Sequence, residues 1–155
     1  MAQPDYRFYS LSSSLNSPFS LFDRPVSFSS QFRFQQAETT LYSLDWFSNG
    51  GRYTVRGFAP SESLGAADGW RFRNDLNIPI QSIPITAYIG WDFGRVTGQG
   101  AKGLSDRTLM GLALGFKWQK FGAKIESFIA QPIVYTGPAA KSECCEISTS
   151  LSWQY

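Results

Sequence analysis

Apolar and polar side chains alternate with a period of two along most of the chain. The clearest case places four apolar side chains on one face of a strand: Val26, Phe28, Phe32 and Phe34. Serine, glutamine and arginine occupy the opposite face of the same stretch. Such alternation is typical of β-strands with one apolar and one polar face. The pattern predicts about seven strands, at residues 6–15, 26–35, 70–78, 85–93, 108–118, 122–131 and 145–155.

The lengths of these strands and of their connections separate two kinds of all-β protein. Soluble strands peak near five or six residues, whereas strands that cross a membrane need about 9 to 11, as found here. Short turns (20–24, 79–84, 119–121) alternate with longer loops (36–69, 94–107, 132–143). Aromatic side chains near the strand ends are expected to form the interfacial girdles of a barrel: Trp70, Trp91, Phe93, Trp118, Trp153 and Tyr155. We therefore predict an all-β fold, an antiparallel transmembrane β-barrel of the outer-membrane type, over the alternative of a soluble β-sandwich binding module.

Composition removes several classes of function. The net charge is only +2, from 14 Lys and Arg against 12 Asp and Glu, which gives no reason to expect a nucleic acid partner. The chain has no histidine, so imidazole-dependent nucleophiles and HExxH zinc sites are excluded. Cys144 and Cys145 are adjacent and would point to opposite faces of a strand, so we interpret them as incidental. We expect no enzyme activity, no metal and no cofactor.

The predicted connection at residues 36–69 is long for a loop without structure, which suggests a functional element. It contains Asn49-Gly50-Gly51, which can turn a hairpin through positive φ angles, and then the motif Val55-Arg56-Gly57-Phe58. With the stretches SLGAADGWRFRNDL (63–76) and AYIGWDFGRV (87–96), this motif resembles the outer-membrane assembly and secretion superfamily. The resemblance covers nearly the whole chain. It is closest to the two-partner secretion branch, the haemolysin-activator and filamentous-haemagglutinin transporters.

The resemblance implies a fold and a set of site residues. In that family a sixteen-stranded barrel follows two periplasmic POTRA domains, and the motif loop folds back into the lumen, where its arginine pairs with a carboxylate on the inner wall. Carried over, the loop motif is Val55, Arg56, Gly57 and Phe58, its inner-wall partners are Asp92 and Gly94, and Trp153 and Tyr155 form a C-terminal assembly signal.

Two features of the residues themselves agree with the implied pairing. The alternation places Asp92 on the polar face of its strand, where an arginine can make a charge-assisted contact. Small residues on the same side of two strands leave room for a loop against the wall: Gly90, Gly94, Gly111, Ala113 and Gly115. Other charged positions are interpreted as general lumen lining or rim charges: Arg33, Arg71, Arg73, Asp75, Lys117, Lys124 and Glu126.

The implied function is export of a large unfolded exoprotein, of the haemolysin or adhesin type, from the periplasm to the surface of a Gram-negative cell. An outer-membrane assembly or insertion factor of the same superfamily is the alternative. Besides the exoprotein, the expected partners are outer-membrane lipid or lipopolysaccharide and the barrel-assembly machinery. Residues 1–155 are expected to form the C-terminal part of one barrel domain, about seven of sixteen strands, with the loop at 36–69 inside the lumen and the POTRA domains and N-terminal strands absent.

Overall fold

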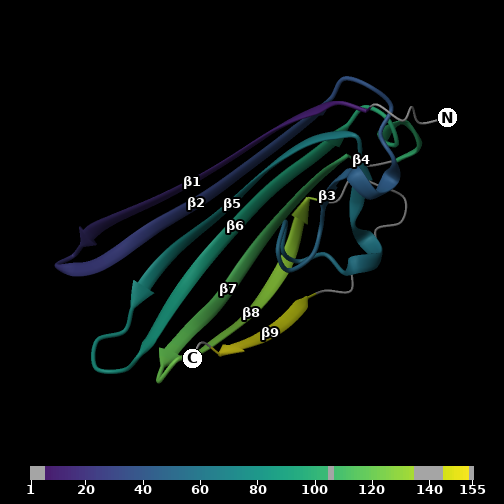
Figure 1. Ribbon diagram of the computed structural model, residues 1–155. Coiled ribbons are helices and arrows are strands. Elements are labelled where there is room, and N and C mark those ends of the chain that lie inside the picture. Colours follow the sequence, from purple (N-terminus) through teal and green to yellow (C-terminus); the bar gives the residue numbers. More distant parts are fainter. Residues whose placement is uncertain (1–5, 105–106, 135–144, 154–155) are drawn as a thin grey trace.

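The computed structural model describes residues 6–104, 107–134 and 145–153. Seven long strands form one antiparallel sheet in the order β1-β2-β5-β6-β7-β8-β9 (Figure 1). Their bounds are β1 Phe8–Leu21, β2 Arg24–Ala37, β5 Asp68–Pro79, β6 Ile85–Thr97, β7 Thr108–Lys120, β8 Ala123–Val134 and β9 Glu146–Trp153. The predicted number of strands and their antiparallel order along the chain are confirmed.

The register of the sheet carries the period-two pattern across neighbouring strands. Phe32 lies opposite Phe72, with ring centroids 4.5 Å apart, and Phe72 lies opposite Phe93. A second apolar row crosses six strands: Phe28, Leu76, Ile89, Leu114, Ile129 and Ile147. Several members of these rows are exposed, so the outer face of the sheet is apolar and uncovered. Such a face suits lipid, as the barrel prediction requires.

No helix among the described residues is long and apolar enough to cross a lipid bilayer.

Connections at the two ends of the sheet differ in length. Phe22-Asp23 and Phe121-Gly122 are two-residue turns with positive φ at both positions, as a type I′ hairpin requires. The predicted turn at 20–24 is therefore too long, because β1 continues in register to Leu21. The longer connections lie at the opposite end (Figure 1). Most of the loop predicted at 132–143 lies outside the described residues.

The prediction of an aromatic girdle is wrong for Trp91. The predicted strand ended at residue 93, which placed this side chain and Phe93 at a strand end, but β6 continues to Thr97, which leaves Trp91 in its middle and Phe93 four residues from its end. There its ring stacks on the Phe28 ring, with centroids 5.8 Å apart. Trp91 lies opposite Asn74 of β5 and Leu112 of β7 in the register. Trp70 and Trp118 do lie near strand ends. Tyr155 lies outside the described residues.

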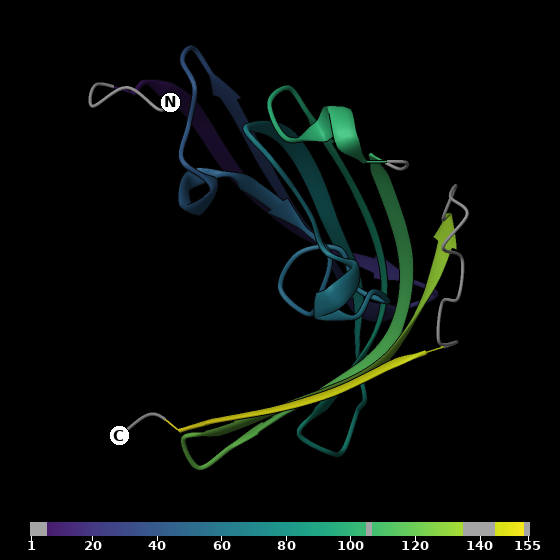
Figure 2. The same ribbon diagram turned by 90° about the vertical axis from the view of Figure 1, so that its right-hand side faces the viewer.

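Residues 38–67, here called the inserted segment, lie inside the curve of the sheet (Figure 2). The segment contains a small second sheet, β3 (Phe47–Asn49) paired with β4 (Leu64–Ala66), and two single 3-10 turns, η1 (Ser43–Asp45) and η2 (Pro60–Glu62); a third, η3 (Ala101–Gly103), follows β6. Gly50 and Gly51 have positive φ angles, as expected, but they do not close a hairpin. The connection between β3 and β4 runs from residue 50 to 63, and it carries the motif.

A small core joins the inserted segment to the sheet. Phe47 and Ala66 of the two short strands pack with Val96 of β6 and Ala101 of η3, all at most 3% exposed. Burial of these side chains against the concave face stabilises the folded-in position of the segment, since removing apolar surface from water is favourable. The connection at residues 50–63, here called the tip, is thereby held against the concave face of the sheet, here called the inner wall.

Candidate functional site

The tip of the inserted segment is buried between the concave face and the rest of the segment. Val55, Arg56 and Phe58 are each 0% exposed, and Gly57 is also buried. Val55 and Phe58 form an apolar cluster with Leu109 of β7, against which Leu64 also packs. This packing positions Arg56, whose side chain turns toward β5 and β6.

Arg56 and Asp92 of β6 form a bidentate ion pair. The guanidinium donates from Nε to Oδ2 at 2.7 Å and from Nη2 to Oδ1 at 2.7 Å, and the backbone N–H of Arg56 donates to Oδ2 at 3.0 Å. Both residues are 0% exposed. Charge-assisted bonds of this geometry are the strong ones in proteins, and here they replace the hydration that both charges lose.

Asp75 of β5 is a second carboxylate at the same guanidinium, and sequence reasoning had placed it among general lumen-lining residues. Its Oδ1 lies 2.7 Å from Nη2 of Arg56, close enough for an ion pair although not aligned as a hydrogen bond. Its other oxygen, Oδ2, accepts from Lys117 at 3.3 Å. Asp75 lies opposite Gly90, two residues from Asp92 on the same face of β6, so the strand register was the signal that would have revealed it.

The remaining donors of Arg56 face a carbonyl and two aromatic rings. Nη2 also donates to the Asn74 carbonyl at 3.3 Å, whereas the buried Nη1 has no hydrogen-bond partner among the described residues. The guanidinium carbon lies 5.6 Å from the Tyr88 ring centroid and 5.9 Å from that of Phe128, where cation–π attraction partly offsets the missing bond. Burial acts to lower the pKa of Arg56, but Asp92 and Asp75 outweigh it and raise the pKa, so the group stays protonated.

Glycines allow the tip to approach the wall this closely. A Cβ on Gly90 would collide with the Arg56 guanidinium, and one on Gly111 with the Arg56 carbonyl oxygen. A Cβ on Gly94 would lie 2.6 Å from the Asn49 amide and 2.8 Å from Val55. Gly57 has φ +96° and leaves no room for a side chain beside the β8 backbone. The expected space for a loop is present at these positions.

At two other positions the expected space is filled from the sheet itself. Gly115 lies against the Tyr88 ring rather than against the inserted segment. Ala113 packs in a cluster with Tyr88, Phe128 and Ala130. The prediction that all five small residues accommodate the loop is therefore wrong for these two, because an aromatic side chain of the neighbouring strand reaches over them.

The inserted segment also forms hydrogen bonds with β9 and with two arginines of β5. The Gly57 N–H donates to Glu146 Oε2 at 2.7 Å, and Arg52 donates to the Ser148 hydroxyl at 2.6 Å. Arg71 and Arg73 donate to the Ser48 and Arg52 carbonyls at 3.0 and 2.6 Å. Sequence reasoning missed Glu146, since nothing local indicates which strand lies beside the motif.

Other predicted positions lie apart from this site. Trp153 is exposed at the end of β9, and Tyr155 and Cys144 lie outside the described residues. Cys145 is exposed just before β9. Within residues 6–104, 107–134 and 145–153, no group of three or more His, Cys, Asp or Glu side chains could hold a metal ion.

Comparison with known proteins decides the family. A family model described as haemolysin secretion/activation protein ShlB/FhaC/HecB matches residues 2–118. The chain belongs to this family. Among curated relatives, the outer membrane transporter CdiB-2 of Burkholderia pseudomallei (strain 1026b) is 35% identical over 107 residues, 69% of this chain. The hemolysin transporter protein HpmB of Proteus mirabilis is 34% identical over 100 residues, 62% of this chain.

The chain spans only 18% of the length of each of these two relatives. Two solved structures share its fold. CdiB from Acinetobacter baumannii superimposes with a TM-score of 0.87 at 24% identity, over 97% of this chain and 27% of that one. CdiB from Escherichia coli superimposes with a TM-score of 0.81 at 23% identity, over 94% of this chain and 27% of that one. The family and these folds confirm the predicted fold class and the location in the outer membrane of a Gram-negative bacterium.

Proposed function

We propose that the chain provides the C-terminal seven strands of a larger barrel, here called the complete barrel, which exports an unfolded exoprotein from the periplasm to the cell surface. Family membership supports this proposal, as do relatives whose names describe transporters. The two edges of the sheet, β1 and β9, need further strands in a bilayer, because unpaired backbone groups are very unfavourable in hydrocarbon.

In the proposed mechanism the inserted segment is a lumenal element held by the Arg56 ion pair. The buried contact of Arg56 with Asp92 and Asp75 is the observation that carries this role. It lies on the inner wall, where an exported polypeptide has to pass. Several contacts hold the tip, but within the part of the chain that the structure describes, only the ion pair of Arg56 buries charges on both partners. Its strength therefore controls how readily the segment moves aside for cargo.

The proposed partners follow from this arrangement. The exoprotein passes along the polar lumenal face, outer-membrane lipid or lipopolysaccharide covers the apolar outer face, and the barrel-assembly machinery recognises the C-terminal strand with Trp153 and Tyr155. Transport takes its energy from folding of the cargo outside the cell. No nucleotide or other cofactor takes part.

The test is secretion of the cognate exoprotein by cells that carry the complete barrel. We expect Arg56→Ala to reduce secreted exoprotein per folded barrel sharply, and Arg107→Ala, which removes an exposed arginine just before β7, to leave it unchanged. Normal secretion by Arg56→Ala would refute the role of the ion pair. If loss of the complete barrel leaves secretion intact but lowers insertion of other outer-membrane proteins, the chain belongs to an assembly factor instead.

A further inference from the structure

Three arginines on the lumenal face of β2 and β5 lie beside the Arg56 site and form a group of like charges. Arg33 lies directly opposite Arg71, and Arg73 follows two residues later on the same face of β5. We call these three residues the arginine cluster. Like charges placed directly opposite each other destabilise a sheet unless something neutralises them.

The described residues supply almost no negative charge to the arginine cluster. The Arg33 side chain forms no ion pair with a carboxylate of any described residue. Arg71 donates to the Ser48 carbonyl and lies 5.3 Å from the Phe47 ring centroid, so its partners are neutral. The described carboxylates beside Arg73 already have partners: Glu126 Oε1, 4.0 Å away, accepts from the Tyr88 hydroxyl, and Asp92, opposite Arg73 in the register, pairs with Arg56.

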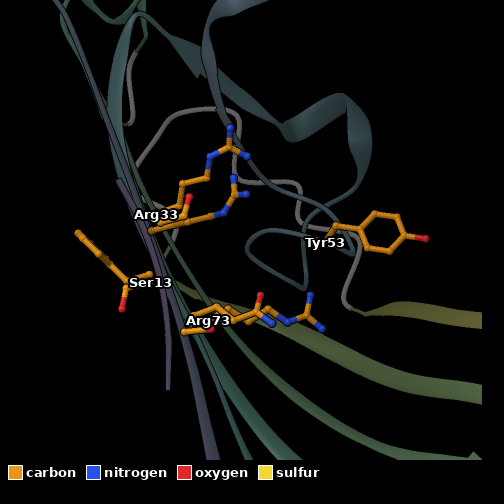
Figure 3. A pocket seen from close by; sticks show the side chains of 9 residues that line it. Ser13, Arg33, Tyr53 and Arg73 are labelled. Carbon is orange, nitrogen blue, oxygen red and sulfur yellow. The ribbon is translucent and has the colours of Figure 1, made fainter. Parts of the chain in front are cut away.

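The arginine cluster lines a cavity of about 250 Å³. In Figure 3, Arg33 and Arg73 extend from the sheet toward the side on which Tyr53 lies, whereas Ser13 lies on the other side of the strands. The neighbouring strands contribute neutral polar groups to the same cavity: Ser12, Ser14 and Gln31. The cavity therefore combines three cations with hydroxyl and amide groups along adjacent strands.

We propose that the arginine cluster binds carboxylate groups, and that its occupant is an acidic stretch of the exoprotein as it passes through the lumen. The planar fork of arginine binds a carboxylate through two parallel hydrogen bonds, which a lysine cannot reproduce. Arg71 and Arg73 are held in place by carbonyls of the inserted segment, while Arg33 is free to close on a ligand. The neutral groups beside them suit the backbone of an extended chain. The identity of the occupant rests on the proposed export function.

The test measures binding of a fluorescein-labelled peptide of glutamate and glycine to the detergent-solubilised complete barrel, by fluorescence anisotropy. A peptide of glutamine and glycine of equal length is the neutral control. We expect the glutamate peptide to bind and the glutamine peptide not to bind. Combining Arg33→Gln with Arg71→Gln should raise Kd for the glutamate peptide at least about tenfold, because one charged hydrogen bond is worth that much.

Two further variants test charge and fold. Arg24→Gln removes an exposed arginine at the turn end of β2 and should leave Kd unchanged. Arg33→Lys keeps the charge without the fork and should give a Kd between those of the wild type and the double variant. Arg33→Lys also serves if the double variant fails to insert, since a wild-type Kd for it would overturn the role of the fork.

Other outcomes overturn the proposal. Equal binding of the glutamine peptide would show non-specific adsorption. An equal loss of affinity for the glutamate peptide in Arg24→Gln would show that only the overall positive charge matters. Full displacement of the glutamate peptide by inorganic phosphate that supplies the same concentration of negative charge would make this a site for small anions rather than for a polypeptide. If the wild-type barrel exports no exoprotein, the export proposal fails, while the peptide measurement still decides whether the cluster binds carboxylates.

Discussion

Removing the Arg56 side chain should release the inserted segment from the wall. In the docked state, Arg56→Ala leaves Asp92, 0% exposed, without an ion-pair partner among the described residues, and leaves Asp75, 7% exposed, with Lys117 as its one described partner. Breaking a buried ion pair from one side costs about 3–5 kcal/mol. Water reaches both carboxylates once the segment leaves, so this cost falls on the docked state. The docking equilibrium should then shift by roughly a hundredfold to a few thousandfold.

The shift can be measured as the accessibility of a buried thiol at the tip. Val55 is 0% exposed, so a thiol introduced by Val55→Cys reacts with a membrane-impermeant maleimide only when the segment is undocked. Cys144 and Cys145 are first replaced by serine. When docking is fast relative to labelling, the labelling rate follows the undocked fraction, and Arg56→Ala should raise it by the same factor until the undocked state dominates.

Two comparisons decide whether the ion pair is responsible. Arg107→Ala removes an exposed charge and should leave the labelling rate unchanged. Asp92→Ala should raise the rate, and the double variant with Arg56→Ala should raise it little further, because both substitutions break one contact. A labelling rate in Arg56→Ala equal to that of the parent, or additive effects in the double variant, would refute the reasoning.

Three further predictions test the wall, the facing of the strands and the C-terminus. Gly111→Ala should destabilise the docked state of the segment by about 1–3 kcal/mol, measured by the same labelling assay, because its Cβ meets the Arg56 carbonyl oxygen. Gly103 has open space around it, so Gly103→Ala should leave the labelling rate unchanged. In the complete barrel, a thiol from Gln31→Cys, on the lumenal face, should label with the impermeant reagent much faster than one from Phe32→Cys, on the outer face; equal rates would mean the facing is wrong. Deleting Tyr155 should lower the amount of folded barrel in the membrane, and unchanged levels on a semi-native gel would contradict an assembly signal.

The strands and their two faces could be predicted from the sequence because they depend on local order. Period-two alternation places each side chain on one of two faces whatever the neighbouring strand is, so the apolar character of Phe32 and Phe72 predicted an outer face that the register bears out. The Arg56 contact with Asp92 came from a resemblance of motifs together with the face on which alternation places Asp92. Strand ends were less well predicted, because β1 and β6 continue in the hydrogen-bonded ladder beyond their predicted C-terminal ends, to Leu21 and Thr97, through residues that break the alternation of apolar and polar positions.

Only the tertiary structure decided which other groups surround Arg56. Asp75 reaches the guanidinium because the register of β5 against β6 places it two residues along from Asp92. Glu146 reaches the Gly57 N–H because the tip extends across the sheet as far as β9, 89 residues away in sequence. Such contacts depend on how deeply the inserted segment enters the curve of the sheet and on the register of strands remote in sequence. These quantities are set by packing of the whole sheet, which no local pattern of residues records.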